Sequence, residues 1–172
     1  MSLKEYAKKR DFSKTPEPPR RSRGKAEGLR FVVHKHHARN LHYDLRLEHK
    51  GVLKSWAIPK GISANPADKR LAIMVEDHPF EYKDFEGLIP EGNYGAGSVI
   101  IWDEGTYFLV GGEETGQDKK MTQQLAKGHL SIVFKGKKLR GEFYMLRLSK
   151  NEKQWLIIKK ADAAASQAGK LR

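Results

Sequence analysis

Four of the seven histidines lie within nine residues of the chain, and two of them are spaced from an aspartate in a way that suits a metal ion. The spacing is His36-x5-His42-x-Asp44. On a β-strand, His42 and Asp44 share one face, with Cβ atoms about 7 Å apart. Two imidazoles and one carboxylate leave coordination positions open, which is typical of catalytic metal sites. The set accepts Mn, Fe, Co, Ni or Zn, and affinity alone does not select among them.

Two further residues suit a phosphate group held near such an ion. Arg46 lies one step past Asp44 on the same strand face, and its guanidinium can hold two non-bridging phosphate oxygens. In the segment 70–78, Arg70, Met74 and Glu76 share a face, and His78 follows on that face if the strand extends to its expected end at 78–79. His78 can therefore donate a hydrogen bond or a proton to a phosphoryl group.

An ordinary salt bridge between Asp44 and Arg46 on a solvated strand face is the alternative to a metal site. A single histidine in a strand is also more often a satisfied polar residue than a ligand. The opposite strand face is unbroken and apolar, and consists of Leu41, Tyr43, Leu45 and Leu47. Asp44 and Arg46 are costly to bury unless they are paired. The spacing alone therefore favours a metal site, but a simple salt bridge stays open as the alternative.

Short β-strands account for most of the pattern after residue 30. Period-two alternation and short β-branched runs predict strands at 31–33, 41–48, 52–58, 70–76, 98–102, 106–110, 130–134, 141–148 and 155–159. Residues 98–110 are expected to form a hairpin that turns at 103–105, and the glycine-rich segment 87–97 is expected to be a loop. A short helix is expected over 121–127, ended by Gly128. These elements predict a mainly β protein, a compact closed or nearly closed β-barrel with one or two short helices.

The glycine-rich loop does not form a nucleotide P-loop. Its sequence from Gly92 to Gly97 lacks both a Gly-Lys-Ser/Thr ending and a following helix. Its glycines are expected to permit tight turns near the barrel. Tyr82, four residues after His78 and flanked by charge, is a better candidate for the site.

The chain carries a strong positive charge that is concentrated in two places. The net charge is +12, with ten Lys/Arg against four Asp/Glu in residues 1–30 and nine against two in residues 135–160. This excess indicates a polyanionic partner, nucleic acid above all, although basic ends can also serve solubility alone. The absence of cysteine excludes disulfides and thiolate ligands and suits a reducing cytosol. No apolar run approaches 18 residues, so neither a membrane span nor a secretory signal is expected.

The length of 172 residues suits one domain with two dissimilar ends. Residues 1–30 combine three prolines with a basic run and are expected to form a basic flexible N-terminal arm. Residues 31–160 are expected to form the β-barrel domain. Residues 161–172, rich in Ala, Ser and Gln, are expected to form a flexible C-terminal tail.

Several long strings, taken in order, resemble the 3′-phosphoesterase domain of bacterial ATP-dependent DNA ligase D and its stand-alone relatives. The resemblance covers roughly residues 4–160. Its strings are Lys-Arg-Asp-Phe at 9–12, His36, Asn-Leu-His-Tyr-Asp-Leu-Arg-Leu at 40–47, Lys-Ser-Trp-Ala-Ile-Pro-Lys-Gly at 54–61, Glu-Asp-His-Pro at 76–79 and Ile-Pro-Glu-Gly-Asn-Tyr-Gly-Ala-Gly at 89–97.

The resemblance implies a manganese-dependent enzyme of DNA end-joining repair whose site also accepts Co²⁺ or Zn²⁺. Such enzymes remove a 3′-terminal ribonucleoside by phosphodiester cleavage and then the remaining 3′-phosphate, leaving a 3′-OH. The implied metal ligands are His36, His42 and Asp44, and the implied phosphate contacts are Arg46 and His78. The implied supporting residues are Lys60, Arg70, Glu76 and Tyr82. His34 stands where the family commonly has Gln, and is expected to point to the same side as His36 and to contact the metal-bound water or the substrate.

The partners that the resemblance implies are the 3′ ends of primer-template DNA or RNA-tipped DNA, with polymerase, ligase or end-binding repair proteins beside them. We expect a monomer of the prokaryotic cytoplasm, associated with the nucleoid and not with a membrane. The alternative is a basic β-barrel without catalysis that binds nucleic-acid ends or docks repair proteins.

Overall fold

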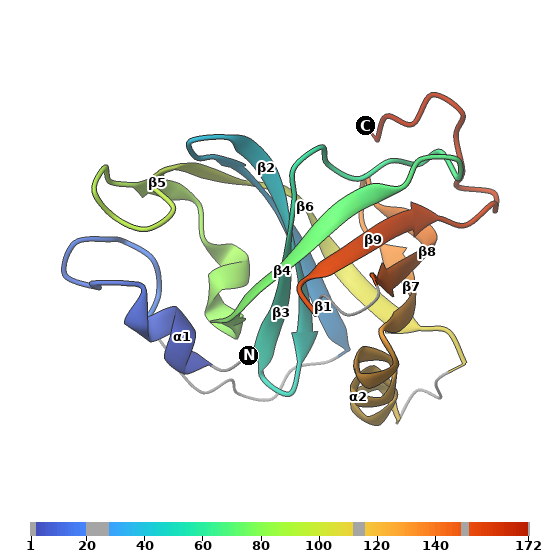
Figure 1. Cartoon of the computed structure of the whole chain (residues 1–172), viewed down its shortest axis with the longest axis horizontal. Coiled ribbons are helices and arrows are strands. Elements are labelled where there is room, and N and C mark those ends of the chain that lie inside the picture. The colour runs from blue at the N-terminus through green and yellow to red at the C-terminus, as the bar shows by residue number, and fades with distance from the viewer. Residues whose placement is uncertain (1–2, 20–27, 112–115, 149–151, 172) are drawn as a thin grey trace.

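The barrel is closed by eight antiparallel strands in the computed structural model, which describes residues 3–19, 28–111, 116–148 and 152–171 (Figure 1). The strands follow the order β1-β2-β3-β4-β9-β8-β7-β6, and β6 pairs back with β1. Their bounds are β1 Leu29–His37, β2 Leu41–His49, β3 Val52–Ile58, β4 Arg70–Pro79, β6 Gly97–Leu109, β7 His129–Lys135, β8 Arg140–Arg147 and β9 Gln154–Lys159. The predicted mainly β fold, a closed barrel with short helices, is confirmed.

The long strand β6 replaces the hairpin expected over 98–110. It runs without a turn, pairing with β1 along most of its length and with β7 from Thr106 to Leu109. The short strand β5 (Gly87–Ile89) pairs with the beginning of β6 and lies inside the expected loop. An Asp-Glu-Gly sequence is a local turn signal, but pairing with two neighbours overrides it. Gly105 is needed in the strand itself, because a Cβ there would lie 2.2 Å from the Lys135 carbonyl oxygen.

Two apolar clusters lie on opposite sides of the barrel wall. The larger fills the barrel interior and includes Leu45, Leu47, Trp56 and Trp155. The smaller lies outside the barrel, and is formed by Tyr6, Leu53, Tyr82, Phe85, Ile89 and Val99. It joins β3 and β6 to α1 (Leu3–Lys8), to the 3-10 helix η1 (Phe80–Asp84) and to β5. The elements over this outer face lie together on one side of the barrel (Figure 1).

The helix α2 (Gln117–Lys127) packs on β6 and β7 and buries Met121 in the barrel core. It ends at Gly128, which has a φ of 70° and whose N–H bonds to carbonyls of the last turn, as its left-handed conformation allows. The expected helix and its glycine end are therefore confirmed. No helix in the described part of the chain has the length and apolar character needed to cross a membrane.

Both ends of the chain pack on the barrel where the structure describes them. Tyr6 is fully buried, and its hydroxyl donates to the carbonyl of Pro18. At the other end, the Ala64 N–H donates to the Gly169 carbonyl, and Leu171 packs against the core. Residues of the segments 3–19 and 161–171 thus contact the barrel, and the flexibility expected for the arm over 1–30 and the tail over 161–172 stays a prediction. Residues 20–27 lie outside the described part.

Candidate metal and phosphate site

The metal-ligand candidates converge on the outer face of the barrel, at one end of β1 and β2. His36 on β1 is paired directly with His42 on β2, and Asp44 follows two residues later. The Asp44 Oδ2 lies 3.6 Å from the His36 Nδ1 and 3.3 Å from the His42 Nε2. One donor atom from each residue lies within 4.8 Å of the others. A three-residue connection between β1 and β2 thus closes the triangle that the sequence spacing predicted.

Backbone carbonyls fix which nitrogen of each histidine is free to bind a metal. The His36 Nε2 lies 2.6 Å from the Gly95 carbonyl, and the His42 Nδ1 lies 2.9 Å from the Asn40 carbonyl. Because a carbonyl only accepts, these two nitrogens carry the protons. The His36 Nδ1 and the His42 Nε2, which lie close to the Asp44 Oδ2, are therefore the nitrogens that a metal can bind once any proton that they donate to Asp44 has left. Metal-binding histidines are commonly held in this way, so the donor set fits a divalent transition metal.

Asp44 is buried and stays ionised because of its neighbours. Burial alone would raise the pKa of Asp44, but the Arg46 charge and the hydrogen bonds from His36 and His42 hold that pKa well below its ordinary value. Burial lowers the pKa of His42, but the hydrogen bond to Asp44, the Asp44 charge and the bond to the Asn40 carbonyl together outweigh it, so the net shift of that pKa is upward. A proton on His42 therefore competes with a metal for the same nitrogen.

Arg46 connects the ligand triangle to the interior of the cleft. Its Nη2 lies 3.4 Å from the Asp44 Oδ2, its Nε donates to the His34 Nδ1 over 3.1 Å, and its Nη1 donates to Ser55. The guanidinium also lies 4.8 Å from the ring centroid of Tyr82. A buried guanidinium fixed on several sides is a preorganised anion contact. Burial and the Arg46 charge lower the pKa of His34 to about 3, so His34 is neutral and acts as an acceptor.

His78 is held as a neutral acceptor in the same cleft. Its Nδ1 lies 2.9 Å from the Glu76 carbonyl and must donate to it. Its Nε2 lies 3.2 Å from the Arg10 Nη2 and must accept from that cation. Burial, followed by the charges of Arg46 and Arg10, holds the pKa of His78 well below its ordinary value. A role as proton donor therefore requires His78 first to take up a proton on Nε2.

A β-bulge in β4 brings His78 to this face. Leu53 of β3 pairs with His78 but Ser55 pairs with Val75, so β4 has one extra residue between the two pairs. Met74 therefore packs against the barrel core, whereas Glu76 and His78 line the outer cleft. The expectation of one unbroken face along 70–78 is wrong for this reason.

Two residues of the N-terminal segment belong to the site, although sequence reasoning missed them. Arg10 donates from Nε to Glu17 over 2.8 Å and from Nη1 to Glu76 over 3.2 Å, and the side chains of all three are buried. The Tyr82 hydroxyl donates to Glu17 over 2.7 Å. Glu76 and Tyr82 thus hold the N-terminal segment against the cleft. The string Lys-Arg-Asp-Phe at 9–12 was the only signal that marked this segment.

The cleft has a volume of about 260 Å³, and its wall combines the triad with the phosphate-contact candidates. Its lining includes His36, His42, Asp44, Arg46, Glu76, His78, Tyr82, Arg10, Glu17 and Tyr94. The glycine-rich loop borders it, and Gly95 permits this with a φ of 74°. Its candidate metal donors, its two arginines with buried side chains and its histidine His78 suit a phosphate ester.

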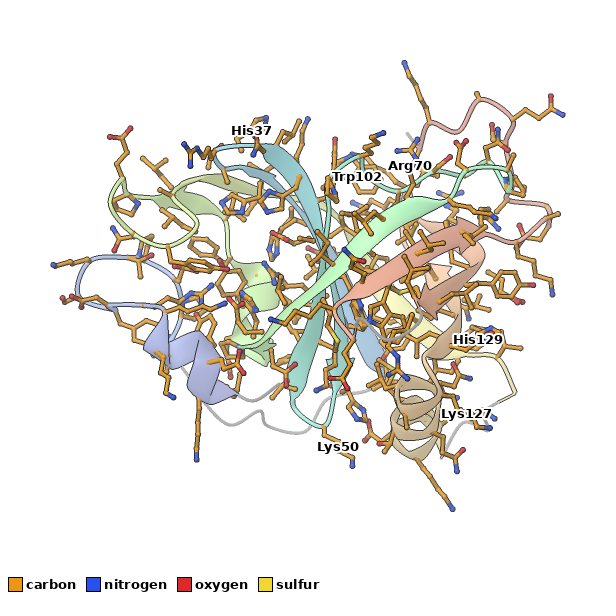
Figure 2. The ribbon with its side chains drawn as sticks, in the orientation of Figure 1. His37, Lys50, Arg70, Trp102, Lys127 and His129 are labelled. Atoms are coloured by element: carbon orange, nitrogen blue, oxygen red, sulfur yellow. The ribbon has the colours of Figure 1, made fainter. Side chains whose placement is uncertain are left out.

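Lys60 and Arg70 lie elsewhere. They line a second hollow of about 390 Å³ at the end of the barrel, together with Tyr43, Trp102 and Leu171. Figure 2 shows Arg70 and Trp102 at this end of the barrel, on the side away from α1. Arg70 lies six residues from Glu76 along β4, or about 20 Å along an extended strand. The expected contact of Lys60 and Arg70 with substrate stays a prediction.

A closed β-barrel with a candidate metal triad beside two buried arginine side chains has the groups that a metal-dependent phosphoesterase requires. Residues 34–147 match the family described as the DNA Ligase D 3'-phosphoesterase domain. The chain belongs to this family, as the resemblance predicted.

The curated relatives are much longer proteins of bacterial end joining. The chain is 50% identical over 167 residues to the multifunctional non-homologous end joining protein LigD of Pseudomonas aeruginosa, covering 95% of this chain and 19% of that protein. It is 44% identical over 155 residues to LigD of Mycobacterium tuberculosis, covering 90% of this chain and 19% of the relative. For LigD of Mycolicibacterium smegmatis the identity is 41% over 165 residues, covering 93% and 21%. The chain thus spans about a fifth of the length of these relatives.

Proposed function

We propose that this chain is a manganese-dependent phosphoesterase that processes the 3′ ends of DNA or RNA-tipped DNA during non-homologous end joining. The observation that carries the proposal is the triad of His36, His42 and Asp44, whose free nitrogens point to one buried carboxylate. Arg46 lies 3.4 Å from that carboxylate, so a phosphate oxygen near the triad would also be within its reach. The names of the relatives support a role in end joining.

The three ligand candidates would hold the ion, and Co²⁺ or Zn²⁺ would also suit their donor atoms. Bound manganese would supply Lewis-acid stabilisation of charge on the phosphate group. The protein contributes rigidity, because the Gly95 and Asn40 carbonyls orient the two imidazoles before any ion arrives.

The remaining work falls to Arg46, His78 and their supports. Arg46 would neutralise negative charge on the non-bridging oxygens as the bond to the leaving oxygen breaks. A phosphate dianion in the cleft favours the protonated form of His78, because a nearby opposite charge raises the pKa of a histidine. His78 could then donate from Nε2 to the leaving oxygen. Arg10, Glu17 and Tyr82 would keep His78 and Arg46 in place.

The substrates we propose are a primer strand that ends in a ribonucleotide and one that ends in a 3′-phosphate. Water would cleave the phosphodiester of the first to release the terminal ribonucleoside and leave a 3′-phosphate, and would cleave the 3′-phosphate of the second to release inorganic phosphate, so the final product would carry a 3′-OH. The net charge of +12 supports a nucleic-acid substrate. Ligase, polymerase and end-binding repair proteins are the proposed partners.

The test is incubation of the purified chain with labelled primer-templates that end in a 3′-phosphate or a 3′-ribonucleotide, with Mn²⁺, Mg²⁺, Zn²⁺ or EDTA. We expect conversion to a 3′-OH end with Mn²⁺ and none with EDTA. Binding of the primer-template without turnover, unchanged by EDTA, would instead favour a barrel that only binds ends. Turnover that persists in EDTA would contradict the metal assignment.

A further inference from the structure

Tyr94 is an exposed aromatic ring at the rim of the cleft that the proposed reaction leaves without a role. Its side chain lines the cleft, yet the residue is 48% exposed. Most other aromatic residues of the site region, such as Tyr6 and Tyr82, are buried in the smaller apolar cluster. Tyr94 is part of neither apolar core cluster. An exposed ring at the mouth of a phosphate site is chemically suited to a base.

The backbone fixes Tyr94 close to the reacting end of the cleft. The next residue, Gly95, offers the carbonyl that accepts from the metal-ligand candidate His36 over 2.6 Å. Tyr94 is therefore one residue from a direct support of the triad. A Cβ on Gly95 would lie 3.4 Å from the His36 ring, so the loop approaches the histidine closely.

Two cations of the N-terminal segment contact the Tyr94 ring. The Lys9 Nζ lies 4.8 Å from the centroid of the Tyr94 ring and 3.5 Å from its hydroxyl oxygen, and the Arg10 guanidinium lies 5.4 Å from the centroid. Arg10 also contacts His78. Tyr94 is therefore linked to both sides of the site, through Gly95 to the triad and through Arg10 to the phosphate-contact candidate.

From this arrangement we propose that Tyr94 stacks on the nucleobase of the nucleotide that carries the scissile phosphate. The inference rests on the proposed function of the same cleft and adds how the end is recognised. Every base has a π face, so stacking recognises a terminal nucleotide without reading its sequence. Lys9 and Arg10, beside the ring, would attract the adjoining phosphates. Tyr94 is thus a positioning residue, which binds the substrate end and takes no part in proton transfer.

The kinetic test pairs changes of the ring with changes of the base. Tyr94→Leu removes the ring, and Tyr94→Phe keeps it. Each protein is assayed with Mn²⁺ on primers whose 3′-phosphate is carried by a normal nucleotide or by an abasic one. For the normal end, we expect Tyr94→Leu to raise KM by roughly 5- to 100-fold with little change in kcat, and Tyr94→Phe to resemble wild type. For the abasic end, the Leu variant and wild type should have the same KM.

Phe108→Leu is the matched control. Phe108 is also an exposed ring, at 39%, with the Lys135 Nζ 5.3 Å from its centroid, but it does not line the cleft. We expect it to behave as wild type on both ends. The proposal is overturned if Tyr94→Leu weakens both ends equally, or if it weakens neither.

A binding measurement separates this proposal from the reaction itself. Primers with 2-aminopurine at the 3′-terminal position are titrated with protein in EDTA, and the fluorescence reports stacking of that base. We expect quenching by wild type and Tyr94→Phe and much less by Tyr94→Leu. Quenching without any hydrolysis in Mn²⁺ would support stacking and contradict the proposed reaction. Hydrolysis with no difference in quenching between wild type and Tyr94→Leu would contradict stacking and leave the reaction supported.

Discussion

The Arg10 Nη2 lies 3.2 Å from the His78 Nε2, across 68 residues of sequence. The His78 Nδ1 is already committed to the Glu76 carbonyl, so this contact makes Nε2 the acceptor. The N-terminal segment is thereby part of the wall of the cleft. Its buried cation also pairs with two buried carboxylates, those of Glu17 and Glu76.

Replacing Arg10 with Ala should impair the site without removing its metal ligands. The change leaves His78 without its donor and Glu17 without its charge partner, so we expect a roughly 10- to 100-fold loss of 3′-phosphate hydrolysis. We also expect the free energy of unfolding to fall by about 3 kcal/mol, because a buried carboxylate is left unpaired. Urea denaturation and steady-state kinetics measure the two effects. Lys14→Ala removes an exposed cation of the same segment and should change neither; an equal effect of both variants would refute the Arg10 role.

The ligand and phosphate residues should separate by metal content. We expect His42→Ala and Asp44→Ala to lose both Mn²⁺ binding and activity while the barrel stays folded. We expect Arg46→Ala and His78→Ala to keep Mn²⁺ but to lose activity about 100- to 1,000-fold, as when a preorganised donor is removed. Calorimetric titration with Mn²⁺ and circular dichroism check each protein. As the control, His37→Ala removes a neighbouring exposed histidine and should match wild type in metal binding and activity. Full activity of the His42 or Asp44 variant would contradict the metal assignment.

Acid should destabilise the fold through His34. Burial and the Arg46 charge lower the pKa of His34 to about 3 in the folded chain, whereas the unfolded chain has an ordinary histidine near 6.5. The unfolded chain therefore binds more protons between these values, so this contribution to stability is complete above about pH 6.5 and is lost as the pH falls toward 3. Its slope is at most about 1.4 kcal/mol per pH unit. His34→Gln keeps an acceptor for Arg46 but does not titrate in this range. We therefore expect the free energy of unfolding of this variant to fall less between pH 7 and pH 4, as measured by urea denaturation of metal-free protein. The same pH dependence in the variant and in wild type would rule out this role of His34.

Gly105 should be required for the straight course of β6. Adding a Cβ at Gly105 places it 2.2 Å from a carbonyl oxygen of β7, whereas a Cβ at Gly87 meets the Phe85 ring at an ordinary 3.5 Å. We expect Gly105→Ala to lower the free energy of unfolding by about 2 kcal/mol or more, and Gly87→Ala to lower it by less than 1 kcal/mol. Chemical denaturation of both variants compares them. Equal stabilities would show that the strand can shift away from β7 at no cost.

The amino-acid sequence by itself determined the ligand-bearing strand. His42, Asp44 and Arg46 alternate with apolar residues, and a period of two is a local property that strand geometry converts directly into two faces. The sequence placed His36 close to this strand but left open whether it lay on the neighbouring strand or on a loop, and in the fold it pairs with His42 from β1. The C-terminal limit of α2 at Gly128 was likewise a local signal, set by a left-handed backbone conformation.

Tertiary structure alone decided the rest of the site. The bulge in β4 depends on pairing with β3, and it separates Met74 from Glu76 and His78 in a way that no alternation predicts. The sequence around Gly105 predicts a turn, but pairing of β6 with β1 and with β7 keeps this segment in a continuous strand. Arg10 and Glu17 lie in a segment whose basic, proline-rich composition suggests an arm. They are ordered by contacts with residues more than 60 positions away, and sequence patterns carry no record of such distant pairings.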